Sequence, residues 1–408
     1  MNKQRYLLIV ISIIGISILA YVLFALFKPI EQKEPIKVGI LHSLTGTMAA
    51  NEKNLVNATL FAIDQINKED GILGKKIHPI VADGQSDPAI FAQEAERLIT
   101  QEKVLVIFGC WTSSSRKAVK EVVEKYNNLL FYPVEYEGLE ESKNIIYTGS
   151  PPSQQIIPGT IWAYKNLGQR FFLVGSDYIF PRAAHEIIKK VVSMLKGEIV
   201  GEEYIPLGSS DVEPVVKKII AANPTVIINT INGDTNARFI KQLRAQGISP
   251  EKIPSMFFSV SEPDFANFQL TGMAGDYATW GYFQSIGTST NRAFVKKFRK
   301  KYGDTQLIGD PMETAYFGVY LWAQTVQEIQ STEIKMLQNA LKNQKYNAPA
   351  GVVYIDNENN HTWKTIRIGK VSYNKQFTTV WDSKKPVRPV PYPPLKTKNE
   401  WLEFVNKI

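Results

Sequence analysis

The stretch VLVIFGCWTSSSRKAVKEVVEKY, residues 104–126, decides the fold class. Its first five residues form a continuous apolar run, which is typical of a strand buried on both faces of a parallel sheet. After a short turn, residues 113–126 place apolar side chains at the spacing of one helix face, behind serines that can cap the helix. The stretch therefore predicts a strand followed by an amphipathic helix, which is half of a βαβ unit.

The same alternation continues on both sides of this stretch. A first series of strands runs from Ile36–Leu41 to Leu129–Val134, and a second series starts near Ser150 and runs to Ser255–Val260. Strand–helix alternation predicts right-handed crossovers and open, doubly wound parallel sheets. Seven or eight such strands in two series favour two similar α/β lobes over one large sheet.

The later part of the chain is less periodic. The expected elements are a strand at Tyr277–Phe283, helices at 291–302 and 311–329, and an antiparallel pair at Gly351–Ile355 and Thr362–Val371. Proline-rich residues 385–395 are expected to be extended, and residues 396–408 to form a C-terminal tail.

The composition and the absence of known motifs exclude several kinds of catalytic site. The 408 residues include one cysteine, Cys110, and four histidines. A single thiol excludes an internal disulfide and CxxC zinc sites, and no HExxH, GxSxG, GxxxxGK[ST] or GxGxxG string occurs. We therefore expect no metal, no cofactor and no enzymatic activity. The net charge is +8, but the basic residues are scattered without interleaved aromatics, so no nucleic-acid partner is expected.

The N-terminus predicts a membrane segment. Leu7–Phe27 is an apolar run of 21 residues. At about 1.5 Å per residue a helix of this length crosses the hydrocarbon core of a bilayer. Lys3 and Arg5 precede it, which keeps the N-terminus in the cytoplasm and the body outside. Residues 1–35 are thus an uncleaved signal anchor with a tether, or a cleaved signal peptide; the poor cleavage site favours the anchor.

The ends of the predicted strands locate a ligand site, because open α/β sheets bind ligands outside the carboxyl ends of their strands. Backbone N–H and hydroxyl groups at the expected helix start near Ser113 offer donors to a carbonyl or carboxylate oxygen. Acidic loop residues offer acceptors to N–H groups. Such a set suits a small molecule with an oxygen end and an amino or amide end, although each residue could equally be a helix cap, a core aromatic or a solvated turn. The candidate ligand-binding residues are Trp111, Thr112, Ser113, Tyr132, Glu135, Asp177, Tyr178, Asn232, Asp234 and Glu262.

Several longer strings carry a family resemblance. They include FGCWTSSSRKAV (108–119), LLFYPVEYEGLE (129–140), LVGSDYIFPR (173–182) and DPMETAYFGVYLW (310–322). Over roughly residues 36–395, the chain resembles substrate-binding proteins of the branched-chain amino-acid/amide type. Within that family it is most similar to the urea-type receptors of ABC transporters, which bind urea or short-chain amides.

The resemblance implies a fold and a function. The implied fold is a type I periplasmic-binding-protein clamshell, in which two Rossmann-like lobes joined by three crossovers close on a ligand by a hinge. It implies lobe 1 at residues 36–150 plus 275–348 and lobe 2 at 151–274 plus 349–395. The implied function is capture of urea or a short-chain amide outside the cytoplasm and delivery to ABC permease and ATPase subunits. The alternative is a membrane-tethered sensor of amides or amino acids that acts on a regulatory partner, since the predicted anchor is unusual for a transport receptor.

The resemblance also assigns roles to residues. First-lobe positions that line the amide pocket of relatives correspond to Trp111–Ser113 and Tyr132, and the second-lobe closing loop corresponds to Asp177 and Tyr178. Related amide sensors have a tyrosine where Trp111 stands, so Trp111 with Glu135 is closer to the urea transporters. We expect Glu135 to accept urea N–H bonds, with support from Asp177 and Glu262. A branched-chain amino acid stays possible, but Glu135 argues against a carboxylate near Ser113.

Overall fold

The computed structural model describes residues 4, 7, 9–17, 34–267 and 272–408. The chain divides into two compact units, residues 1–35 and Ile36–Ile408. In the first unit, residues 9–17 are helical. No helix among the described residues is long and apolar enough to cross a membrane. Residue 8 and residues 18–27 of the predicted anchor Leu7–Phe27 lie outside the described residues, so the anchor stays a prediction.

The first lobe of the body is built on a five-stranded parallel sheet in the order β2-β1-β3-β4-β5. Its strands are β1 (Ile36–His42), β2 (Ile77–Asp83), β3 (Ile107–Gly109), β4 (Leu130–Tyr132) and β5 (Ile145–Tyr147). Right-handed crossovers place α2 (Ala49–Lys68) on one face and α3 (Pro88–Thr100) and α4 (Ser113–Lys125) on the other. The helix pairs that pack together agree with this, since α3 contacts α4, and α2 contacts α11 (Asp310–Ile329).

The second lobe is built on a seven-stranded sheet in the order β15-β14-β10-β9-β8-β6-β7. Its parallel strands are β6 (Arg170–Ser176), β7 (Glu198–Ile205), β8 (Val226–Thr230), β9 (Ser255–Phe257) and β10 (Tyr277–Trp280); β14 (Arg367–Val371) and β15 (Phe377–Asp382) are antiparallel. The covering helices are η1 (Pro152–Gln154), α5 (Ile156–Asn166), α6 (Ile179–Met194), α7 (Glu213–Ala222), α8 (Asp234–Ala245) and α9 (Asp264–Asn267). In β6, Phe171 and Leu173 enter one core and Phe172 and Val174 the other, as expected of a strand buried on both faces.

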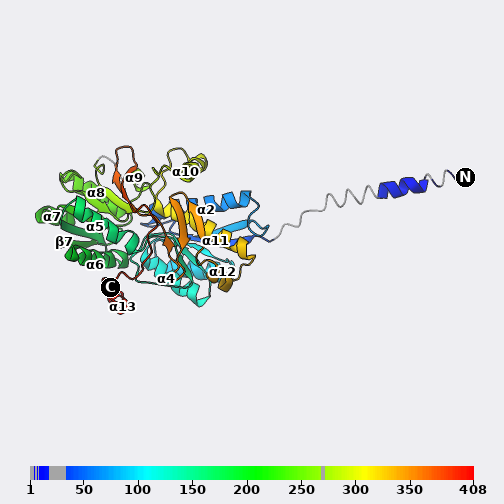
Figure 1. Ribbon diagram of the computed structural model, residues 1–408, viewed down its shortest axis with the longest axis horizontal. Helices are drawn as coiled ribbons and strands as arrows, with labels where there is room; N and C mark the ends of the chain where they lie inside the picture. Colours follow the sequence, from blue (N-terminus) through cyan, green and yellow to red (C-terminus); the bar gives the residue numbers. More distant parts are fainter. Residues whose placement is uncertain (1–3, 5–6, 8, 18–33, 268–271) are drawn as a thin grey trace. The chain divides into compact units, whose positions relative to one another are not determined.

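A smaller antiparallel sheet completes the first lobe. It contains β11 (Lys345–Ala348), β12 (Gly351–Ile355) and β13 (Thr362–Trp363). Strand β11 contacts α10 (Ser289–Tyr302) and α11, and α11 in turn contacts α12 (Ile334–Ala340). Phe294, Leu337 and Val353 from these elements belong to the same core as the five-stranded sheet. Figure 1 shows the two lobes of the body, with α5, α6, α7 and α8 in one and α2, α4, α11 and α12 in the other.

Strand pairing corrects two expected boundaries. β10 pairs with β9 and β14 in the second sheet, so the chain re-enters the first lobe after β10 and not at residue 275. β12 and β13 pair with each other on the first lobe, so the return crossover follows β13 and does not fall at residue 349. The predicted strand Thr362–Val371 is therefore two strands in different sheets. An apolar run reveals that a strand is buried but not which strand it pairs with.

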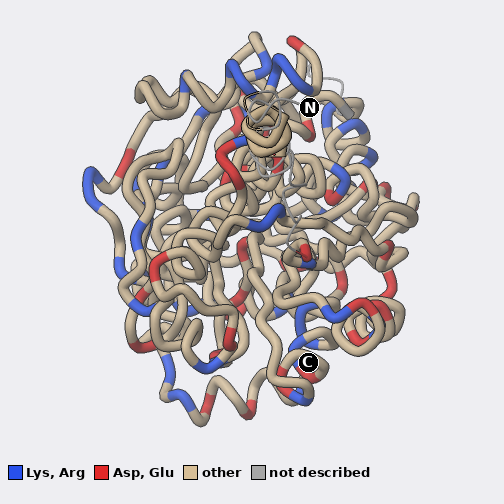
Figure 2. The backbone as a smooth tube through the Cα atoms, turned by 90° about the vertical axis from the view of Figure 1, so that its right-hand side faces the viewer, with Lys and Arg blue, Asp and Glu red and all other residues tan. Residues whose placement is uncertain are grey.

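The C-terminal residues form more than a tail. Helix α13 (Lys398–Val405) begins with a capping box, in which the Thr397 and Glu400 side chains each bond the other's backbone N–H. Trp401 is fully buried in a core of the second lobe. Figure 2 shows Lys and Arg interspersed with Asp and Glu along the backbone of the body, in keeping with the scattered basic residues of the sequence.

Candidate functional site

The two lobes meet directly at the carboxyl ends of their strands. The Trp111 indole N–H of the first lobe donates to Asn232 Oδ1 of the second across 3.2 Å, and both residues are buried. Two further bonds cross between the lobes, from Thr47 Oγ1 to Asp234 Oδ1 at 2.6 Å and from Asn51 Nδ2 to Asp264 Oδ1 at 2.7 Å. Such direct bonds define a closed arrangement of the clamshell.

The turn after β3 holds Trp111 in place. Cys110 adopts a φ of 69°, in the left-handed region that side chains rarely occupy, which turns the chain sharply out of the strand. The Tyr132 hydroxyl donates to the Trp111 carbonyl oxygen at 2.5 Å. Thr112, and not a serine, caps α4, because its Oγ1 accepts from the Ser115 N–H at 3.1 Å. Ser113 is therefore not the N-cap residue but the first residue of the helix.

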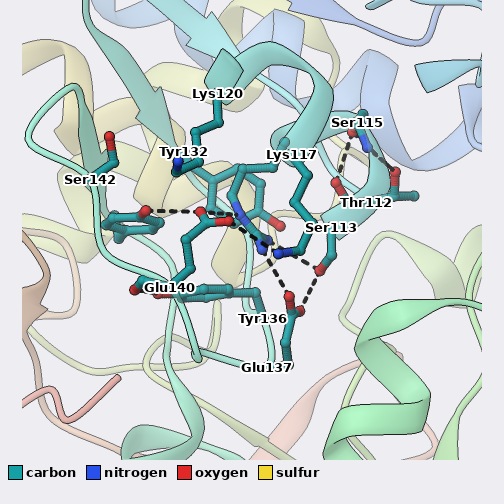
Figure 3. Close-up of polar contacts among 12 residues, drawn as sticks. Thr112, Ser113, Ser115, Lys117, Lys120, Tyr132, Tyr136, Glu137, Glu140 and Ser142 are labelled. Carbon is teal, nitrogen blue, oxygen red and sulfur yellow. Dashed lines mark hydrogen bonds and ion pairs between the residues drawn. The ribbon is translucent and has the colours of Figure 1, made fainter. Parts of the chain in front are cut away.

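A buried ion network lies behind Ser113. The Ser113 hydroxyl donates to Glu137 Oε2 and accepts from Arg116 Nη1 at 3.1 Å. Arg116 also donates through Nη2 to Glu137 Oε1 at 2.8 Å and through Nε to Glu140 Oε1 at 3.0 Å. Arg116 and Glu137 are fully buried and Glu140 nearly so. Figure 3 shows Ser113 meeting Glu137 at the start of α4, with Glu140 and Tyr136 beside them.

This network fixes the charges of its members. Burial lowers the pKa of Arg116, but the carboxylates of Glu140 and Glu137 outweigh it and raise that pKa well above its usual value. Burial by itself raises the pKa of Glu140. The charges of Arg116 and Lys117 outweigh burial and lower that pKa from 4.5 to about 2. Arg116 is therefore a permanent cation one helical turn from Ser113, with its charge already matched by carboxylates.

A second cluster of buried acids lies where the lobes join. Burial raises the pKa of Glu135 well above its usual value, and the charges of Asp310 and Asp264 add to that rise. Burial likewise raises the pKa of Glu262 to about 8. Glu262 Oε1 accepts from the Gln284 N–H at 2.7 Å, but Glu262 Oε2, Glu135 Oε2 and Asp310 Oδ1 have no partner among the described residues. Lys364 is near enough to lower the pKa of Glu135 slightly, although its Nζ donates to the Thr148 carbonyl at 2.5 Å.

The second-lobe candidates fall into two groups. Tyr178 lies close to first-lobe side chains, since Tyr132 and Glu135 raise its pKa in addition to burial. Asn232 meets Trp111 as described. Asp177 and Asp234 are instead exposed: Asp177 pairs with Arg182 at 2.7 Å, and Asp234 bonds Thr47 and pairs with Arg238.

Several residues that the structure brings to this region are not among the candidate ligand-binding residues drawn from the sequence. They are Arg116, Glu137, Asp264, Asp310 and Lys364. One signal was available for Arg116, which lies three residues after Ser113 and so on the same helix face. Asp310 opens α11 behind Gly309, but nothing local indicates that its Oδ2 accepts from the backbone N–H groups of Gly281 and Tyr282. Across the described residues, no group of three or more His, Cys, Asp or Glu side chains is arranged to hold a metal ion.

Two α/β lobes that meet at the carboxyl ends of their strands, with buried polar side chains between them, are typical of bilobal solute-binding proteins. A Leu/Ile/Val-binding protein homolog of Brucella melitensis is 22% identical over 378 residues, covering 89% of this chain and 96% of that protein. The crystal structure of a solute-binding protein of an ABC transporter from Rhodopseudomonas palustris, in complex with 3,4-dihydroxybenzoic acid, is similar with a TM-score of 0.80 and 23% identity. That similarity covers 88% of this chain and 99% of the other.

A third relative is matched only in part. A protein of Geobacillus stearothermophilus named limonene hydroxylase is 34% identical over 134 residues, which are 33% of this chain and 24% of that protein. The match thus spans about a quarter of that relative's length.

The periplasmic binding protein domain matches residues 36–398, and the chain belongs to that family. Proteins of this family lie outside the cytoplasm, bind small molecules and hand them to ABC permeases. The Brucella and Rhodopseudomonas relatives, which match most of this chain, are named as binding proteins and not as enzymes.

Proposed function

We propose that this protein is an extracytoplasmic receptor that captures urea or a short-chain amide between its lobes and delivers it, chemically unchanged, to an ABC importer. One observation carries the proposal: the joined lobes bury carboxyl oxygens of Glu135 and Glu262 that no described residue pairs. A buried polar group without a partner costs about 1–3 kcal/mol. A ligand that supplies N–H donors removes this cost.

The complementary end of the site is the start of α4. The first N–H groups of a helix have no carbonyl acceptor within it, and they carry a partial positive charge. Those of Ser113 and Ser114 suit the carbonyl oxygen of urea or an amide. Donors at one end and acceptors at the other match a planar, neutral molecule with one oxygen and one or two NH₂ groups.

The named ligands of the relatives fit this site less well. Leucine and 3,4-dihydroxybenzoic acid each bring a carboxylate. In this protein such a group would meet the buried acids Glu135, Glu137 and Glu262. Of nearby cations, Arg116 is already paired with Glu137 and Glu140. Burying a ligand carboxylate near Glu137 and Glu140, which already pair with Arg116, is therefore unfavourable.

We assign roles within the site accordingly. Trp111, Tyr132 and Tyr178 form its aromatic walls, and Glu135 and Glu262 accept ligand N–H bonds. Thr112 shapes the start of α4 at Ser113. Asn232 and Asp234 act mainly in closure, through their bonds to Trp111 and Thr47. We assign Asp177 to the rim of the cleft, because it is exposed and paired with Arg182.

Calorimetric titration of the full chain with urea, acetamide and leucine tests the proposal. Saturable binding of urea or acetamide is expected, with no response to leucine. Glu135→Ala is expected to weaken urea binding about tenfold, which corresponds to the loss of a hydrogen bond in a buried site. The matched control is Glu141→Ala, an exposed acid in the same loop that pairs with Lys398 and should change nothing. Unaltered urea affinity in Glu135→Ala would remove that residue from the site.

The importer and the sensor differ in their partners. Co-purification with a permease and an ATPase supports delivery to an importer, whereas a co-purifying regulator would support the sensor.

A further inference from the structure

The Ser113 hydroxyl is unusual among the site groups because its hydrogen bonds are already committed. A hydroxyl has one proton to donate and two lone pairs. The proton goes to Glu137 Oε2, and one lone pair accepts from Arg116 Nη1 at 3.1 Å. All three residues are at most 1% exposed, so water does not compete for these bonds. What remains for a ligand is a single lone pair.

We propose that Glu137, held by Arg116, fixes the Ser113 hydroxyl as an acceptor beside the backbone N–H donors of Ser113 and Ser114, so that the site selects a neutral ligand whose N–H group lies next to its oxygen and rejects carboxylates. This inference deepens the proposed function and rests on it for the location of the ligand. Glu137 does not need to touch the ligand; it is a positioning residue that acts through Ser113.

Arg116 determines which oxygen of Glu137 bonds Ser113. Its Nη2 donates to Glu137 Oε1 at 2.8 Å, while Oε2 of the same carboxylate receives the Ser113 proton. If residue 137 is glutamine, the Arg116 donor requires the amide oxygen at the Oε1 position. The amide NH₂ must then stand at the Oε2 position and donate to Ser113 Oγ. The hydroxyl proton is released and becomes a donor toward the cleft, so Glu137→Gln inverts the polarity of Ser113 with almost no change in shape.

The chain offers a matched control in Glu140. Glu140 binds the same guanidinium, through Nε at 3.0 Å, and also accepts from the Tyr147 hydroxyl at 2.9 Å, but it has no bond to Ser113. Glu140→Gln therefore removes one carboxylate from Arg116, as Glu137→Gln does, and leaves the Ser113 proton where it is. A purely structural effect of disturbing Arg116 would appear in both variants.

Acetamide and acetate are the probes, since they share a shape and differ in whether they carry N–H donors. The wild-type full chain is expected to bind acetamide and urea and to show no acetate binding. Glu137→Gln is expected to weaken acetamide about tenfold and to strengthen acetate by a similar factor, whereas Glu140→Gln should change the acetamide-to-acetate ratio less than about twofold. Equal shifts of the ratio in the two variants, or a wild type that prefers acetate, would overturn the inference.

If circular dichroism shows that Glu137→Gln does not fold, Ser113→Ala tests the inference instead. Loss of the acceptor should weaken acetamide about tenfold without creating acetate binding, and unchanged acetamide affinity would overturn the inference.

A ligand-free readout separates the inference from the proposed function. A buried hydroxyl proton bonded to Glu137 should exchange slowly and give an NMR resonance that both Ser113→Ala and Glu137→Gln abolish. If that resonance is present but neither urea nor acetamide binds, the polarity of Ser113 stands and the proposed ligand fails. If no such resonance exists, the inference fails whatever the ligand.

Discussion

Glu262 allows a quantitative test of how burial of an acidic side chain makes the free energy of unfolding depend on pH. Its side chain is fully buried and burial raises its pKa from 4.5 to about 8, with Asp310 and Asp264 adding to the rise. A folded-state pKa above the unfolded value means that the folded protein binds the proton more tightly. The contribution of Glu262 to stability is therefore fully present below about pH 4.5 and is lost as the pH rises through about 8.

The size of the loss follows from these pKa values. Each unit of pKa difference is worth about 1.4 kcal/mol, and at pH 7 Glu262 must take up a proton that the unfolded chain has already released. Over the interval from pH 5 to pH 7 the free energy of unfolding should fall by about 2 to 3 kcal/mol through this residue alone. Glu262→Gln cannot titrate, and its amide oxygen can still accept from the Gln284 N–H, so the variant should lack that part of the pH dependence.

Differential scanning calorimetry of the ligand-free wild type and Glu262→Gln at pH 5 and pH 7 measures the difference. Thermal unfolding is required, because urea and guanidinium resemble the proposed ligand. From pH 5 to pH 7, the free energy of unfolding of the variant should rise by about 2 to 3 kcal/mol relative to that of the wild type. A wild-type-minus-variant difference that stays constant from pH 5 to pH 7 would refute the reasoning, since it would mean that Glu262 is not held in its neutral form by burial.

Three further predictions concern packing, closure and the buried ion pair. Trp401→Ala should destabilise the protein by about 3–5 kcal/mol in calorimetry, because the fully buried indole also donates to the Pro393 carbonyl at 2.8 Å. Asn232→Ala should weaken urea binding about tenfold in a titration while leaving the melting temperature of the ligand-free protein within a few degrees, because the Trp111 N–H loses its buried acceptor in the closed form. Glu140→Gln should cost about 3–5 kcal/mol at neutral pH; since the pKa of Glu140 is lowered to about 2, this cost should shrink as the pH falls from 4.5 toward 2, which calorimetry at pH 7 and pH 3 would show.

The sequence predicted the βα alternation because its signals are local. Helix α3, for example, begins at Pro88 because Asp87 caps its first N–H groups and Pro88 suits the first turn. Short or edge strands were missed: β5 and β11 span three and four residues, and β15 lies at the edge of its sheet. Such strands depend on their partners more than on their own composition.

The candidate site was predictable to the same extent. The strand-end rule selected Trp111 and Glu135, because residues in the loop after a buried strand lie at the carboxyl end of that strand. It could not locate Asp310 or Lys364, whose neighbours come from the crossovers that join the lobes. It also gave no means to separate Asp234, which is exposed and bonded to Thr47, from the buried acids. Burial of a charge depends on tertiary structure, and sequence spacing does not encode it.

The closed form itself argues for a small ligand. The bond from the Trp111 indole to Asn232 joins the two lobes directly at 3.2 Å, which leaves no room for a ligand between these two groups. A planar aromatic acid such as 3,4-dihydroxybenzoic acid would need far more of the space between the lobes than urea does. Because Glu135 and Glu262 keep unpaired oxygens in this same closed form, we expect the ligand to bring hydrogen-bonding groups that pair with them. Size and polarity thus both favour the proposed ligand, a compact, neutral molecule with N–H groups, and we expect its binding to stabilise the closed lobes by pairing groups that closure alone leaves unpaired.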